Sequence, residues 1–133
     1  MGEPLYVRIA DPATLAAASD ALHDAPFDGN DIRYDPTTQN FDMIFRREVS
    51  GRLAPTRFRN VCVEVEEPEQ RWAKCRLTFR QVEDADIRIN VRRGAELIDL
   101  EYDSGTDTVT VDAGGAVDIV LRVTELDGEL ADI

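Results

Sequence analysis

The sequence predicts an α+β protein dominated by antiparallel β-structure, either a barrel or a sandwich of about eight strands with one N-terminal helix. Apolar residues recur at every second position through most of the 133 residues, and turn-forming residues separate these runs. Only the segment after Asp11 combines a helix start signal with an apolar stripe of helical spacing. The length predicts a single domain spanning residues 1–133.

The chain opens with a predicted strand and the predicted helix. Residues 5–9 alternate apolar and polar side chains, which is typical of a strand with one buried face. Asp11 followed by Pro12 favours a helix start, because Asp caps free backbone amides and Pro is tolerated at the first helical position. Pro26 ends the helix, since the residue before a proline is pushed out of helical dihedral angles. The apolar stripe of the helix consists of Leu15, Ala18 and Leu22.

A hairpin pattern occurs twice, 68 positions apart. Residues 32–35 and 100–103 each end in Tyr-Asp, and each precedes a short polar turn and a second alternating run. Tyr-Asp before a turn is a common local solution, because Asp bonds its own backbone and the Tyr ring covers a neighbouring strand. The alternative is that the chain contains two related β units, closed on one another as a pseudo-symmetric barrel or sandwich.

The remaining alternating runs predict further strands. The step from Phe58 to Val61 breaks the two-residue period, which suggests a β-bulge near Asn60. The same break recurs 21 positions later, at residues 79–82. These further strands are expected around residues 58–66, 74–79, 87–91 and 117–123.

The net charge and its distribution indicate which classes of partner are disfavoured. A net charge of −12 argues against a nucleic-acid-binding protein, whose affinity comes from basic residues, and it disfavours anionic membrane surfaces. No apolar run is long enough to cross a bilayer, and the N-terminus lacks the pattern of a signal peptide, so we expect a cytoplasmic protein. Residues 44–93 carry 12 basic and 8 acidic side chains, whereas the segments on either side are net acidic.

Residue types that carry catalysis or bind metals are scarce. Cys62 and Cys75 each lie in an apolar strand, where a free thiol behaves as a small hydrophobic side chain, although a disulfide between neighbouring strands is the alternative. The only histidine, His23, stands at the end of the predicted helix, where capping or exposure explains it. We therefore predict no cofactor, no metal site and no catalytic residue.

One group of residues points to binding. If their strands are adjacent, four arginines form a stripe beside the only Trp, and Arg with Trp is the composition of an interaction hot spot. Such a stripe suits an anionic ligand or an acidic partner, whereas the alternative is internal salt pairing with the acidic surplus. The candidate site residues are Arg57, Arg59, Trp72, Arg76 and Arg80.

Around residues 4–47 the chain resembles a family of small, uncharacterised bacterial proteins. The resemblance is carried by the run from Leu5 to Ala10, the helix ending in His23-Asp24-Ala25, the strand at residues 31–34 and the pair Arg46-Arg47. It implies a small stand-alone bacterial protein and no particular activity.

These observations favour a non-enzymatic accessory or adaptor protein that binds another protein, including an inhibitor whose acidic surface meets a basic partner. The alternative is a carrier that holds a small ligand inside a β-barrel, with Tyr34, Phe41 and Tyr102 lining the cavity. An enzyme is the third possibility, because the sequence offers no nucleophile–base pair and no metal-ligand set. The oligomeric state is not predicted.

Overall fold

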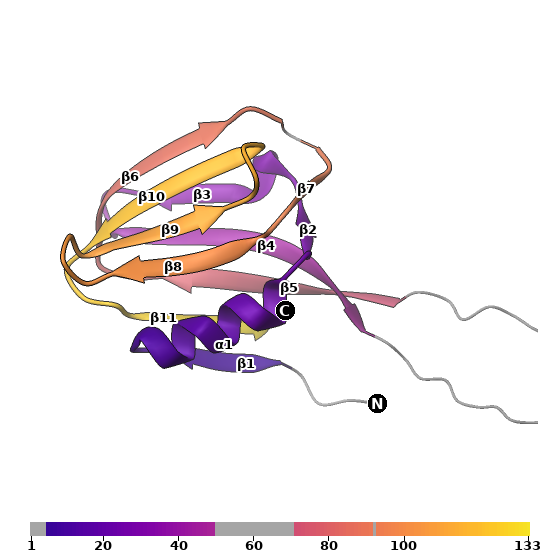
Figure 1. Ribbon diagram of the computed structural model, residues 1–133, viewed down its shortest axis with the longest axis horizontal. Coiled ribbons are helices and arrows are strands. Elements are labelled where there is room, and N and C mark those ends of the chain that lie inside the picture. Colours follow the sequence, from indigo (N-terminus) through magenta and orange to yellow (C-terminus); the bar gives the residue numbers. More distant parts are fainter. Residues whose placement is uncertain (1–4, 50–70, 92) are drawn as a thin grey trace, which may run out of the picture.

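The computed structural model describes residues 5–49, 71–91 and 93–133, and within them the protein is a two-layered antiparallel β-structure with one α-helix (Figure 1). The first layer is a five-stranded sheet in the order β1 (Tyr6–Ile9), β11 (Gly128–Asp132), β5 (Arg71–Phe79), β4 (Asn40–Val49) and β3 (Ile32–Asp35). The second is a four-stranded sheet in the order β6 (Val82–Ile89), β10 (Val117–Val123), β9 (Thr108–Asp112) and β8 (Asp99–Asp103). A short ribbon of β2 (Pro26–Phe27) and β7 (Ala95–Glu96) lies at one end.

The predicted fold class is confirmed in its sandwich form, because the two sheets do not close into a barrel in the described part of the chain. The described residues contain eleven strands rather than about eight. The sequence did not predict the two-residue strands β2 and β7, nor β11, which offers only a short apolar alternation around Leu130. The strand and bulge predicted around Asn60 lie outside the described residues.

The predicted helix is confirmed as α1 (Pro12–Leu22). The Asp11 carboxylate accepts a hydrogen bond from the Thr14 backbone N–H at 2.9 Å, and the Thr14 hydroxyl lies 3.0 Å from the Asp11 backbone nitrogen, so both groups cap the helix start. α1 contacts β1 of one sheet and β8 of the other, and so covers the gap between these two edges (Figure 1). Ser19 fixes this position by donating to the Asp99 carboxylate at 2.7 Å.

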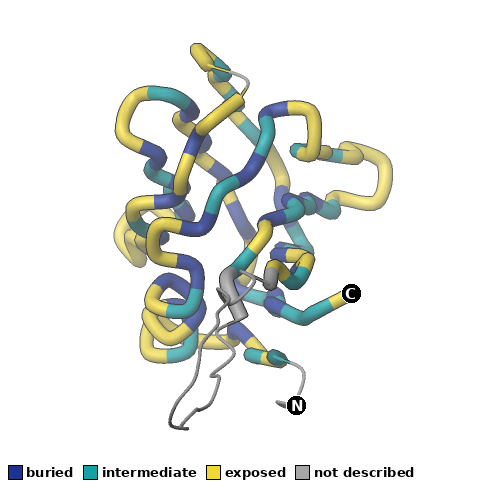
Figure 2. Tube along the Cα trace, turned by 90° about the vertical axis from the view of Figure 1, so that its right-hand side faces the viewer, coloured by how far each residue is buried: buried dark blue, intermediate teal, exposed yellow. Residues whose placement is uncertain are grey.

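Large apolar side chains fill the space between the sheets. Buried positions lie along the interior of the strands, whereas the turns are mostly exposed (Figure 2). The rings of Phe27 and Phe45 meet edge to face with centroids 5.1 Å apart, which joins the short ribbon to the five-stranded sheet. The largest fully buried side chains include Phe41, Met43, Phe45, Phe79, Leu77, Ile119 and Leu121. The carrier alternative assumes a closed β-barrel, which the described strands do not form.

The two Tyr-Asp hairpins occupy equivalent places in a repeated arrangement. In the first unit, β3, β4 and β5 are neighbours in the five-stranded sheet, and the next strand, β6, belongs to the four-stranded sheet. In the second unit, β8, β9 and β10 are neighbours in the four-stranded sheet, and the next strand, β11, belongs to the five-stranded sheet. Each hairpin turn ends in a residue with a left-handed backbone, Gln39 (φ 62°) and Asp107 (φ 55°). The carbonyl oxygens of these residues accept hydrogen bonds from Val82 and Val123, each at 2.9 Å. The described strands thus have the arrangement expected of two related β units, with α1 and β1 outside it.

An ion pair lies on the inner side of the five-stranded sheet, near one end. Arg47 on β4 donates two hydrogen bonds, of 3.1 and 2.8 Å, to the carboxylate of Asp132 on β11, reaching across the strand between them. The hydrogen bonds from Arg47 lower the pKa of Asp132. Asp132 also accepts from the backbone N–H of Leu5 at 2.9 Å, so a single carboxylate links β4, β11 and the residue before β1.

Candidate binding face

The structure places two of the five predicted site residues on one exposed face. Trp72 and Arg76 both project from the outer side of β5, since residues two apart in a strand share a face. Trp72 is 48% exposed, so a large part of its ring surface is open to solvent on this face. Arg57 and Arg59 lie outside the described residues.

Arg80 has an internal role in the structure. Its guanidinium donates to the Asp127 carboxylate at 3.2 Å and to the Glu129 carboxylate at 3.0 Å. The hydrogen bond to Glu129 is the main reason why the pKa of Arg80 is raised. Arg80 is therefore paired with carboxylates of its own chain, which is the alternative to partner binding raised in the sequence analysis.

Three other basic side chains, from three neighbouring strands, join Arg76. Lys74 lies between Trp72 and Arg76 on the same face of β5, and Arg46 is its direct cross-strand partner on β4. Arg33 lies on the outer face of β3, opposite Asp42 of β4. We call this surface the basic face and define it by Arg33, Arg46, Lys74 and Arg76.

The basic face is electrostatically unbalanced. None of its four cations has an ion-pair partner among the residues that the structure describes, although the whole chain carries 27 acidic residues. Lys74 and Arg46 stand directly opposite each other, and like charges in that position destabilise a sheet. In the part of the chain that the structure describes, no ion pair therefore neutralises these two cations.

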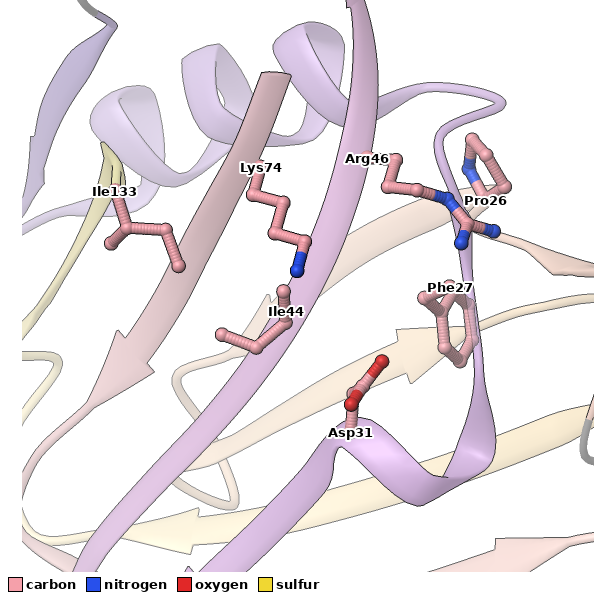
Figure 3. Close-up of a pocket in the computed structure, with 7 residues that line it drawn as sticks. All are labelled: Pro26, Phe27, Asp31, Ile44, Arg46, Lys74 and Ile133. Carbon is pink, nitrogen blue, oxygen red and sulfur yellow. The ribbon is translucent and has the colours of Figure 1, made fainter. Parts of the chain in front are cut away.

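The basic face contains a hollow with a mixed apolar and charged lining (Figure 3). Its volume is about 260 Å³. The charged ends of Lys74, Arg46 and Asp31 face the space between Ile44 and Phe27. Pro26 and Ile133 complete its apolar lining. A ligand group in this hollow would meet two cations, one carboxylate and an apolar surface at once.

A second hollow, of about 200 Å³, adjoins the first. Asp31 and Ile44 line both hollows, so the two share a wall. The cations of the second hollow are Arg33 and Arg76, and its other described lining residues are Asp31, Asp42 and Ile44. Its Asp42 carboxylate accepts a hydrogen bond from Thr78 at 2.9 Å. The basic face therefore offers two pairs of cations side by side.

The structure also shows the surroundings of the histidine and of one of the cysteines considered in the sequence analysis. The Nδ1 atom of His23 lies 3.1 Å from the Ile98 carbonyl oxygen, so this ring connects the end of α1 to the segment before β8. Cys75 is free and fully buried, and burial raises the pKa of its thiol to about 11. Cys62 lies outside the described residues. Within residues 5–49, 71–91 and 93–133 there is no group of three or more His, Cys, Asp or Glu side chains placed to hold a metal ion.

The described helical residues include no segment of the length and apolarity needed to span a bilayer. No protein-family model matches the chain, and no curated protein or solved structure shows a significant similarity to it. The functional argument therefore depends on the geometry of the basic face.

Sequence reasoning missed Lys74, Arg46 and Arg33 as members of this surface. Lys74 could have been found, because it lies two residues from both Trp72 and Arg76 in an alternating strand. Arg46 and Arg33 could not, since only the pairing of β3, β4 and β5 brings them beside Lys74 and Arg76.

Proposed function

We propose that this protein is a non-enzymatic binding protein that docks an acidic partner protein on its basic face. The observation that carries the proposal is the pair Lys74 and Arg46, two directly opposed cations that have no counter-ion in the described structure. A carboxylate placed between them would relieve their repulsion, so binding would gain from an unfavourable arrangement in the free protein.

Apolar contact area supports a protein as the partner. Trp72 (48% exposed) lies on the same face as the cations, and Ile133 (59% exposed) borders the first hollow. Exposed aromatic and aliphatic side chains among arginines are typical of protein interfaces. The backbone N–H of Ile133 donates to the Lys74 carbonyl oxygen at 3.0 Å, which holds this side chain beside the hollow.

The proposal is tested by affinity capture from the native cell with three versions of the immobilised protein. These are the unaltered chain, Lys74→Gln with Arg46→Gln, and Arg122→Gln. Arg122 is the control for position, because it is an exposed strand cation on the outer face of the four-stranded sheet. We expect a specific protein that is retained by the unaltered chain and by the control but not by the double variant.

Salt provides a second measurement. Ionic contacts at an exposed face weaken as salt rises from 0.1 M, where the Debye length is about 10 Å, towards 1 M, where it is about 3 Å. The captured protein should therefore elute with added salt. Capture that is unchanged in the double variant, or lost only in the control, would show that another surface binds the partner and would refute the proposal.

A further inference from the structure

The two hollows also limit the shape of the bound segment, and the following inference rests on the proposed function. We infer that the basic face recognises an extended peptide whose two carboxylates lie two residues apart, with an apolar side chain on the same side. The hollows adjoin, and each supplies two cations, so two carboxylates can be held at once.

The spacing follows from the strand that carries the cations. Lys74 borders the first hollow and Arg76 the second, and they are two residues apart on one face of β5. Along a strand this separation is about 6.6–6.8 Å. An extended peptide lying along β5 repeats its own same-side residues at that distance, so carboxylates at positions i and i+2 match the two cations.

The lining of the first hollow gives the position of the apolar side chain. Phe27, Pro26 and Ile133 line the first hollow but not the second, and among the described apolar residues Ile44 alone lines both. An apolar side chain is therefore best placed at the end of the peptide near Lys74, two residues beyond the first carboxylate.

Two acidic residues on the face provide hydrogen-bond acceptors for the backbone of a bound peptide. Asp31 lines both hollows and Asp42 lines the second, so carboxylate oxygens stand beside the four cations. Asp31 has no ion-pair partner in the described structure, and its oxygens can accept a backbone N–H of an extended peptide. The combination suits an acidic peptide better than a nucleic acid.

The test uses capped seven-residue peptides of Ser. The spaced peptide has Leu at its second position and Glu at its fourth and sixth; its isomer has the second Glu at the fifth position instead. A third peptide replaces the Leu of the spaced peptide by Ser. Binding is followed by the fluorescence of Trp72, the only Trp in the chain, and independently by titration calorimetry.

We expect the spaced peptide to bind about tenfold more tightly than its isomer, which points its second carboxylate away from the face. Arg76→Gln should weaken the spaced peptide about tenfold and leave the isomer unchanged. Lys74→Gln should weaken both peptides, removal of Leu should weaken binding severalfold, and Arg122→Gln should change neither affinity.

Equal affinities for the two isomers, or equal effects of Arg76→Gln on both, would overturn the spacing while the capture experiment still supports an acidic partner. Failure of the spaced peptide to bind at 1 mM would overturn it in the same way. Displacement of the spaced peptide by a single-stranded oligonucleotide, with the same dependence on Lys74 and Arg76, would replace the peptide by a nucleic acid. Capture of a partner that does not depend on Lys74 and Arg46 would instead count against the proposed function itself.

Discussion

Replacing Lys74 by Gln should make this protein more stable while it weakens binding. Lys74 and Arg46 are direct cross-strand partners on the exposed side of β4 and β5, and no described carboxylate pairs with either. A like-charge pair in this position destabilises a sheet by about 0.2–1 kcal/mol. Removing one charge should therefore raise the free energy of unfolding by about that amount, and Tm by about 1–4 °C.

The control for this experiment is Arg122→Gln, which changes the net charge by the same one unit. Arg122 stands directly opposite Asp84, so its removal ends an attraction instead of a repulsion. The two variants should thus shift stability in opposite directions, although any effect of overall charge is the same in both.

The assay is urea unfolding at about 20 mM and 500 mM NaCl, followed by Trp72 fluorescence and by circular dichroism. Salt shortens the range of the repulsion, so the gain from Lys74→Gln should be largest at low salt and small at high salt. In a double-mutant cycle, Arg46→Gln should stabilise less when Lys74 is already neutral. A loss of stability for Lys74→Gln as large as that for Arg122→Gln would refute the claim that Lys74 and Arg46 repel each other in the folded protein.

Three further predictions concern the interior. Asp132→Asn should reduce stability by about 1–3 kcal/mol at pH 7, because Arg47 loses its charged partner. Arg47 lowers the pKa of Asp132, so the stabilisation by the Asp132 carboxylate is complete above about pH 4 and is lost as pH falls through the lower pKa of the folded state. The unfolding free energies of the unaltered protein and of Asp132→Asn should therefore converge on acid titration. Gly128→Ala should cost about 1–3 kcal/mol in urea unfolding, as its Cβ would meet a backbone carbonyl oxygen of β5; an unchanged midpoint would contradict this close approach. In a Cys62→Ser background, Cys75 should react with Ellman's reagent only as fast as the protein unfolds, whereas rapid labelling of the native protein would show that this thiol is accessible.

The alternating patterns predicted the fold class because each strand buries one face. β10 shows this most plainly, with every second residue from Val117 to Val123 buried and those between exposed. The helix was equally predictable, since Asp11 and Pro12 specify its start by local chemistry alone. Strands of two residues have no period to detect, and β2 and β7 form because tertiary contacts such as the Phe27–Phe45 ring pair hold them.

The basic face was only partly predictable, for a related reason. Residues on one strand, such as Trp72 and Arg76, can be assigned to one face from their spacing. The contribution of β4 depends on register: a shift of one residue would turn Arg46 inward and Arg47 outward. The sequence also shows no difference between Arg80, which binds two carboxylates of its own chain, and Arg76, which binds none in the described structure.

The repeated arrangement of the two halves has an electrostatic consequence. At three equivalent outer positions, identified from the 68-residue offset and the strand registers, the residue is basic or neutral in the five-stranded sheet and acidic in the four-stranded sheet. The equivalent pairs are Arg33 and Glu101, Ile44 and Asp112, and Arg76 and Asp118. One backbone plan thus carries positive charge on one outer surface and negative charge on the opposite one, which gives the molecule a dipole across its thickness. An acidic protein that approaches the four-stranded sheet is repelled, whereas one that approaches the five-stranded sheet is attracted, so the field selects the orientation of encounter before any contact forms.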